Sequence, residues 1–521
     1  MVSQRPLRKR TFIVVMFLFI LEPRVECGVL ALSSPNDQGA GRFGKSVSGI
    51  PDLTGDGRDD VVVGAWGEEL GDEFPSSHGL VYIFDGATGD LLKTLISPNR
   101  QQNGRFGASV SGIPDTNGDG YGDVIVGTQS EETAGSVENS GLAYIFDGYT
   151  GALLHQLVSP VTLTEDFGGF GRVVAGIPDI NDDGRGDVIL RSGGELPDGP
   201  GAAHVYDGSS GSLIRTLVSP NPQRGGIFGE SISSIPDVNG DGTSDIVIGA
   251  PGEEMGLPNL MLRSGMAYVF DGSSGELLHT LMSLNPDGPG HFGYSVGGVP
   301  DVNGDGRGDV VVGAFEDPPP TFDGRVYIFD GFTGERLRII SSPLGGHSGS
   351  FGDKVAGLED VNGDGKGDVL VGALLASESV GFERPGRGYI FDGSNGNLLH
   401  TFVSPNQRSH GRFAESLASI PDTNGDGKPE VIFGTTIEHP GDSPDGAGRA
   451  YIFYSPFDDM SGCTSPNLVE DNFVNVKDLI TVKELWTRRK EVSQSDFNLD
   501  GLVDGLDLYV FQDSWYEITS P

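Results

Sequence analysis

A nine-residue pattern of oxygen-bearing side chains, D-x-[NT]-x-D-G-x-x-[DE], occurs once in each of seven repeated units of this chain of 521 residues. Positions 1, 3, 5 and 9 supply side-chain oxygens, and position 7 can supply a backbone carbonyl. The glycine at position 6 permits the sharp turn that directs these oxygens inward. Hard cations prefer several oxygen ligands of this kind, so the pattern predicts up to seven calcium sites.

Two interpretations of a single such loop are open. It is either a metal site or an Asx turn without metal. Recurrence at one place in a repeat favours metal, because clustered carboxylates repel one another unless a cation intervenes. The first loop is weaker because Thr54 is a poorer ligand, and the seventh is weaker because Glu430 has a longer arm. The candidate ligands are Asp52, Thr54, Asp56, Asp60, Asp115, Asn117, Asp119, Asp123, Asp179, Asn181, Asp183, Asp187, Asp237, Asn239, Asp241, Asp245, Asp301, Asn303, Asp305, Asp309, Asp360, Asn362, Asp364, Asp368, Asp422, Asn424, Asp426 and Glu430.

A second set of acids recurs three residues after the small residue that ends a Val/Ile-rich segment. Each acid either caps its own turn by accepting backbone N–H bonds, or belongs to a ring of carboxylates on the face opposite the calcium loops. Such a ring would bind a basic or cation-bridged ligand. The six candidates are Glu68, Glu131, Glu195, Glu253, Asp317 and Glu438.

These residues are carried by a repeat of roughly 60 residues. Each unit contains four strand signals, which in the first unit are FGKSVSGI, the segment 60–64, VYIFDG and LLKTLISP. Four antiparallel strands per repeat are typical of one propeller blade. The sequence therefore predicts an all-β fold, a seven-bladed β-propeller over residues 28–457. The units begin near Phe43, Phe106, Phe170, Phe228, Phe292, Phe351 and Phe413.

The two ends of the repeat region predict a closed ring. The seventh unit has a third strand at 451–454 but no fourth-strand segment after it. The segment Val29–Asn36 reads VLALSSPN and matches the end of a fourth strand, such as LISPN at 95–99. We expect this N-terminal strand to complete the seventh blade and to remove an exposed sheet edge.

The units resemble the FG-GAP repeats of the integrin α-chain propeller. Phe228-Gly229 and Gly249-Ala250-Pro251 spell both halves of that motif in one unit. The resemblance implies a seven-bladed propeller, calcium in the hairpins between the first and second strands, and adhesion-type binding. The chain departs from integrins because every unit carries a loop, and because leg domains and an anchor are not recognisable. Integrin heterodimer formation is therefore not implied.

The N-terminal residues 1–27 are predicted to be a signal peptide, with a basic start and a short apolar run at 11–21. That run is shorter than the roughly 20 residues that span a bilayer, so we expect a secreted or cell-surface protein without a membrane span. The formal net charge of −40 makes nucleic acid a poor partner.

The C-terminal residues 463–521 show a different pattern, with one EF-hand-type loop and a degenerate copy at 467–478. A short apolar helix at 506–515 is predicted after the EF-hand-type loop and a helical run at 479–490 after the degenerate copy, so we expect a small helical module that holds one or two further calcium ions. It resembles a type I dockerin, which implies docking to a cohesin-like receptor; the alternative is a tail that packs on the same chain. The candidate ligands are Asp496, Asn498, Asp500, Asp504 and Asp507.

No catalytic constellation is recognisable. The segment 293–297, GYSVG, matches a nucleophile elbow, but Ser295 falls in a predicted strand rather than at a strand-to-helix turn. We therefore expect a non-enzymatic adhesion or interaction module that binds an extracellular protein or polysaccharide. The alternative is a propeller-based polysaccharide-degrading enzyme, or an enzyme subunit docked through the C-terminal module.

Overall fold

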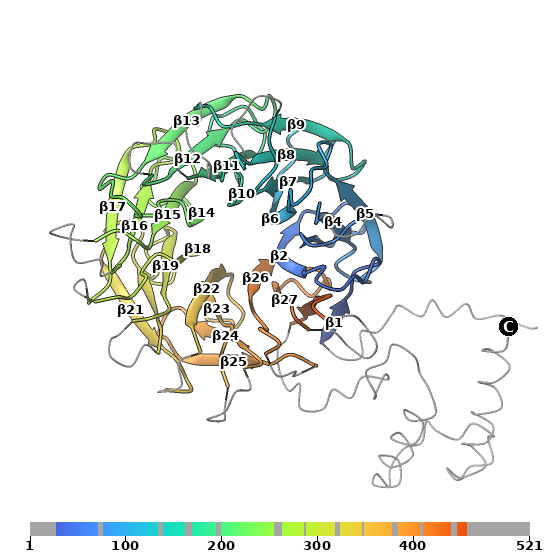
Figure 1. Ribbon diagram of the computed structural model, residues 1–521. Helices are drawn as coiled ribbons and strands as arrows, with labels where there is room; N and C mark the ends of the chain where they lie inside the picture. Colours follow the sequence, from blue (N-terminus) through green and yellow to red (C-terminus); the bar gives the residue numbers. More distant parts are fainter. Residues whose placement is uncertain are drawn as a thin grey trace, which may run out of the picture.

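The computed structural model describes residues 28–70, 77–133, 139–161, 169–193, 199–254, 263–285, 288–317, 323–345, 349–377, 384–406, 410–438 and 445–455. In this part of the chain, seven antiparallel four-stranded sheets form a closed ring (Figure 1). The first strand of each blade lies nearest the centre of the ring and the fourth lies at the perimeter. The predicted seven-bladed β-propeller is confirmed. The predicted C-terminal helical module and the signal peptide lie outside the described residues.

The blades are numbered 1 to 7 in chain order of their first strands. Blades 1 to 3 comprise β2 (Phe43–Ile50), β3 (Asp60–Ala65), β4 (Leu80–Phe84), β5 (Leu91–Ile96); β6 (Phe106–Ile113), β7 (Asp123–Thr128), β8 (Leu142–Asp147), β9 (Leu153–Leu157); and β10 (Val174–Ile177), β11 (Asp187–Ser192), β12 (Ala202–Tyr206), β13 (Leu213–Val218). Blades 4 and 5 comprise β14 (Ser231–Ile235), β15 (Asp245–Ala250), β16 (Met266–Phe270), β17 (Leu277–Met282); and β18 (Ser295–Val299), β19 (Asp309–Ala314), β20 (Arg325–Phe329), β21 (Arg336–Ser341). Blades 6 and 7 comprise β22 (Phe351–Leu358), β23 (Asp368–Ala373), β24 (Arg387–Asp392), β25 (Leu398–Phe402); and β26 (Ser416–Ile420), β27 (Glu430–Thr435), β28 (Arg449–Phe453) and β1 (Val29–Leu32).

The hydrophobic core lies between neighbouring sheets. Every residue of β3 and of β4 is buried, because each face of a middle strand packs against another blade. The outer strand β5 is mostly exposed. The phenylalanine of each FG motif is a central core residue: Phe43 is fully buried and packs edge-on against Phe84. The motif that identifies the repeat in sequence therefore contributes to packing between sheets.

Six of the seven second strands carry a glycine near their end, and close backbone approach requires it. A Cβ on Gly64 would lie 2.1 Å from the carbonyl oxygen of Gly107 in the next blade, and a Cβ on Gly127 would lie 1.9 Å from that of Gly171. Neither contact is possible for a larger residue without a backbone shift. Gly107 itself has a φ of +81°, which favours glycine over other residues.

Strand β1 closes the ring by pairing antiparallel with β28, from Val29 opposite Phe453 to Leu32 opposite Ala450 (Figure 1). The N–H of Tyr454 also donates to the carbonyl of Gly28 at 2.7 Å. The predicted closure is confirmed, although the strand ends at Leu32 rather than continuing through the whole predicted segment. The following residues instead contact blade 1, since Asn36 Nδ2 donates to the carbonyl of Glu69 at 2.6 Å.

Truncation of Leu32 to alanine tests this closure. The side chain is 2 % exposed in the core between blades 7 and 1, so Leu32→Ala is expected to lower the free energy of unfolding by about 2–5 kcal/mol. Deletion of residues 28–36 is expected to expose the edge of β28 and to promote aggregation. Urea denaturation and light scattering measure the two effects.

The matched control is Leu91→Ala, because Leu91 is 43 % exposed on an outer strand. A change within about 0.5 kcal/mol is expected there. Equal stability of the Leu32 and Leu91 variants, together with a soluble and stable deletion variant, would show that β1 does not hold the ring closed.

Candidate functional site

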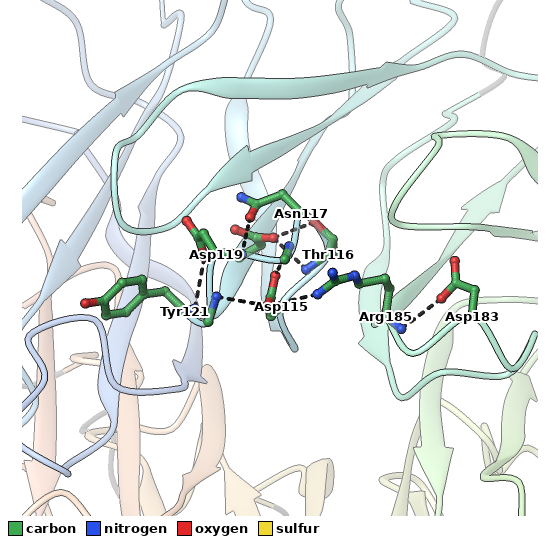
Figure 2. A network of polar contacts seen from close by, with 10 residues as sticks. Asp115, Thr116, Asn117, Asp119, Tyr121, Asp183 and Arg185 are labelled. Atoms are coloured by element: carbon green, nitrogen blue, oxygen red, sulfur yellow. Dashed lines mark hydrogen bonds and ion pairs between the residues drawn. The ribbon is translucent and has the colours of Figure 1, made fainter.

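The seven acidic loops all connect the first and second strands of a blade, so they lie on one face of the ring, here the calcium-loop face. In blade 2, Asp115 accepts the N–H groups of Gly118 at 2.5 Å and Gly120 at 3.0 Å (Figure 2). Asn117 Oδ1 accepts the N–H of Asp119 at 2.9 Å. These bonds curl the loop around the side chains at positions 1, 3 and 5. The sequence produces this shape because glycine at positions 4 and 6 has positive φ here.

In blades 1 and 2, backbone N–H groups hold the position-1 carboxylates Asp52 and Asp115 ionised. Burial opposes ionisation of Asp52, but the N–H groups of Gly57, Gly55 and Thr54 outweigh it and hold the pKa below the usual value. The pKa of Asp115 is lowered in the same way, with additional help from Arg185. The loops therefore present negative charge at ordinary pH.

The position-9 carboxylates are buried at the start of the second strand. Asp60 Oδ2 accepts the N–H of Leu53 at 2.8 Å, and its Oδ1 accepts the N–H of Gly86, in the turn between the third and fourth strands, at 3.1 Å. The same pair of contacts recurs in the other blades, so position 9 joins the loop to a second turn. Burial raises the pKa to about 7 for Asp60, Asp309, Asp368 and Glu430, and to about 6 for Asp187 and Asp245.

The closest convergence of carboxylates is in blade 7. Among the described residues, only Asp422, Asp426 and Glu430 form a group of three acids whose ligand oxygens all lie within 4.8 Å of one another. These oxygens also accept hydrogen bonds within the loop: Asp422 Oδ1 accepts the N–H groups of Gly425 and Asp426, and Glu430 Oε2 accepts the N–H of Thr423. Carboxylate and amide oxygens are ligands that calcium prefers, so this set fits the ion. The longer arm of Glu430, which made this loop weaker in sequence, helps to bring the oxygens together.

Neighbouring loops are joined by basic side chains at position 7. Arg185 of blade 3 reaches Asp115 of blade 2 at 3.1 Å (Figure 2). Arg307 donates to the carbonyl of Val238 at 2.9 Å. Both arginines begin an Arg-Gly-Asp tripeptide whose aspartate is fully buried, so these tripeptides are not presented to a receptor. These links join the acidic loops of blades 2 and 3 and of blades 4 and 5.

The second set of acids is not a surface ring. Glu68, Glu131, Glu253, Asp317 and Glu438 are all fully buried, which makes the interpretation as surface ligands for a basic partner wrong for these five. Each accepts a hydrogen bond from the tyrosine of the third strand in its own blade. The phenol-to-carboxylate pairs are Tyr82–Glu68, Tyr144–Glu131, Tyr268–Glu253, Tyr327–Asp317 and Tyr451–Glu438. Glu195 lies outside the described residues.

The alternative interpretation of turn caps was also incomplete, because Asp317 accepts hydrogen bonds from Ser283 Oγ at 2.7 Å and Asn285 Nδ2 at 2.6 Å, both in the link that enters its blade. In other blades a glutamine of the link binds the backbone of the residue that follows the acid. Gln101 Nε2 donates to the carbonyl of Glu132 at 2.7 Å, while its Oε1 accepts the N–H of Glu132 at 2.9 Å. The same pair joins Gln38 to Glu69 and Gln223 to Glu254. Sequence reasoning missed this role, although the repeated SPNxQ segment carries the signal.

Replacement of Glu253 by glutamine tests the buried pairs. Burial raises the pKa of Glu253 from its ordinary 4.5 to about 7. The folded protein therefore keeps this proton to higher pH than the unfolded chain, so wild-type stability falls as pH rises from 4.5 to 7. Glu253→Gln removes that loss. Its stability relative to wild type is expected to rise by on the order of 1–3 kcal/mol between pH 5 and pH 8.

Urea denaturation at fixed calcium measures this difference, in which the contributions of all other groups cancel. Tyr268→Phe is the control, since it removes the hydrogen bond and leaves the carboxyl group. It is expected to shift stability without removing the pH dependence. A Glu253→Gln curve parallel to wild type from pH 5 to pH 8 would contradict the assignment.

The chain matches the model of the FG-GAP repeat at residues 106–146, 228–259, 292–329 and 351–391, which fall in blades 2, 4, 5 and 6. It is similar to integrin alpha-3 of Cricetulus griseus, with 32 % identity over 258 residues, covering 47 % of this chain and 21 % of the relative. Integrin alpha-11 of Homo sapiens is 33 % identical over 237 residues, covering 43 % and 17 %. Integrin alpha-PS3 of Drosophila melanogaster is 34 % identical over 186 residues, covering 34 % and 16 %.

The aligned part thus spans about a fifth or less of the length of these relatives. Within the described residues, no helix has the length and apolar character needed to cross a membrane. The sequence matches and the seven four-stranded blades agree on one architecture. The described part of this chain is a seven-bladed β-propeller that matches the FG-GAP repeat in four blades and is similar in sequence to integrin alpha chains.

Proposed function

We propose that the protein is a secreted, calcium-stabilised propeller that binds an extracellular protein or polysaccharide without catalysis. At the level of the family, an integrin-like FG-GAP propeller supports an extracellular interaction or adhesion role. The observation that carries the calcium part is the recurrence of one acidic loop on one face of all seven blades, with converging oxygens in blade 7. Calcium and ligand are both part of this proposal.

The role of calcium in the proposal is structural. Side chains at positions 1, 3, 5 and 9 would hold the ion, together with the carbonyl at position 7. A bound cation offsets the repulsion between carboxylates that the fold brings together, and binding to the native state alone adds to stability. Because neighbouring loops are connected, one occupied site also supports the next. The opposite face, with its variable connections, is left for the ligand.

Two adjacent aspartates in blade 3 provide a matched test of the metal sites. Asp183 is at position 5, a ligand position, whereas Asp182 is exposed at position 4. Asp183→Asn is expected to lower the calcium stoichiometry by one and to lower the melting temperature in millimolar calcium. Asp182→Asn removes the same charge and is expected to change neither, since asparagine tolerates the positive φ of 64° there.

Metal analysis after equilibrium dialysis and thermal melts with and without chelator measure both effects. Chelation is expected to lower the melting temperature of the wild type, and added calcium to restore it. A protein that binds no ion at millimolar calcium, or that loses the same amount of calcium in both variants, would overturn the calcium proposal.

The C-terminal residues 463–521 enter the proposal as a dockerin-like calcium module that docks to a cohesin-like receptor. In the full chain, Asp500→Ala is expected to remove one calcium ion and to abolish capture by an immobilised cohesin, while ligand binding by the propeller is retained. A tail that packs on the propeller would instead lower the melting temperature of the propeller when Asp500 is changed, with no receptor capture in the wild type. Metal analysis, the capture assay and the melts separate these results.

A further inference from the structure

Blade 3 departs from the repeat where the other blades are most alike. Six blades place glycine near the end of the second strand, whereas blade 3 has Arg191. Six blades place tyrosine in the third strand, whereas blade 3 has His204, which contacts Ser192 at 2.8 Å and Thr216 at 2.9 Å. In the other blades, close backbone approach requires glycine at this position. Arg191 carries a large side chain there instead.

Arg191 lines a cavity of about 290 Å³ between blades 2 and 3. The other lining residues include Arg105, which precedes β6, and Arg172, which precedes β10. These positions, and the ends of β7 and β11 beside them, lie at the ends of the strands away from the acidic loops. The cavity therefore opens on the face opposite the calcium-loop face.

The three arginines exceed the acid that neutralises them. Glu230 accepts Arg191 Nη1 at 2.7 Å and Arg172 Nη2 at 3.4 Å, so one carboxylate serves two guanidinium groups. Arg105 is held by Gln129 Oε1 at 3.2 Å and by the ring of Trp66, whose centroid is 4.8 Å from its guanidinium carbon. A protein of net charge −40 thus gathers positive charge in one cavity.

A buried donor also lacks a partner at this cavity. The side chain of Arg191 is only 8 % exposed, and its Nε has no hydrogen-bond partner among the described residues. A buried N–H without a partner is costly, and a charged one more so. An acceptor that enters the cavity would satisfy this donor, and an anion would do so most strongly because guanidinium groups match carboxylate and sulfate geometry.

The remaining lining residues suit the hydroxyl groups of a sugar. Among the described residues that line the cavity, the groups beside the arginines are the amides of Gln129 and Asn139, the hydroxyl of Ser130 and glycine backbone. None is apolar. Amides and hydroxyls donate to and accept from sugar hydroxyls, and a sugar ring presents both hydroxyl groups and apolar C–H faces to such a surface.

We infer that the cavity between blades 2 and 3 binds the carboxylate or sulfate group of an acidic sugar, with Arg105, Arg172 and Arg191 holding the anion. This inference rests on the proposed binding function and names its ligand class. Sugar hydroxyls would contact the surrounding amides and Ser130. Binding is expected to weaken with added salt, because partly exposed charges are screened.

Isothermal titration calorimetry on the full chain at fixed calcium tests the site. Oligogalacturonate supplies carboxylates, a sulfated oligosaccharide supplies sulfates, and cellohexaose is the neutral control. The wild type is expected to bind at least one acidic oligosaccharide and not cellohexaose. Arg172→Gln, at a side chain that is 48 % exposed, is expected to weaken this binding at least about tenfold without affecting the fold.

Two further variants separate geometry from charge. Arg105→Lys keeps the charge but loses the planar guanidinium, and is expected to weaken binding several-fold. Arg336→Gln removes an exposed arginine from the outer strand of blade 5 and is expected to leave binding unchanged. Melting temperatures confirm that each variant is folded.

The inference is overturned if neither acidic oligosaccharide binds, if cellohexaose binds as well as they do, or if Arg172→Gln and Arg336→Gln bind alike. It is also overturned if a poly-glutamate peptide binds through the same arginines while the sugars do not. If the Arg172 and Arg336 variants bind alike, or if poly-glutamate binds and the sugars do not, the propeller still binds a ligand and the proposed function stands. Failure of the wild type to bind any extracellular protein or polysaccharide in a broad screen would remove both.

Discussion

Neighbouring sheets in this ring approach so closely that their backbones touch near the end of each second strand. A single Cβ on Gly249 would lie 1.9 Å from the carbonyl oxygen of Gly293 in the next blade. That contact, together with the buried phenylalanine of each FG motif, sets the spacing between blades, and the core residues fill the space that remains. The glycines of the repeat are therefore geometric requirements of the ring, and their replacement in one blade changes the surface only there.

The electrostatics of the two faces follow from this packing. Every blade has a buried position-9 carboxylate on the calcium-loop face, and five blades also have a buried carboxylate paired with tyrosine on the other face. The first accepts backbone N–H groups, and the second accepts the hydroxyl of the tyrosine. Burying these acids opposes ionisation, so their hydrogen bonds act mainly to fix loops and links in position rather than to add stability.

Much of this architecture was predictable, because a repeat of four strand signals admits few folds and the unmatched strands at the two ends complement each other. The buried acid–tyrosine pairs were not predictable. Tyr268, for example, is 15 residues from its partner Glu253, across a hairpin whose register only the fold determines. The arginine cavity was missed for a related reason. Arg191 replaces the glycine found in the other blades. Its neighbours in space, Arg105 and Arg172, lie before the first strands of blades 2 and 3 and are not at a regular sequence spacing from Arg191.

The pairing of β1 with β28 has a consequence for how the molecule is oriented. Because the strands are antiparallel, Gly28 and Tyr454 lie together, and Ser455 contacts the acidic loop of blade 7 through Asp426 at 2.8 Å. The described chain therefore enters and leaves the ring beside the acidic loops. Any tether, label or support joined through either end meets the ring at that side. The arginine cavity then lies on the face of the ring that points away from the attachment.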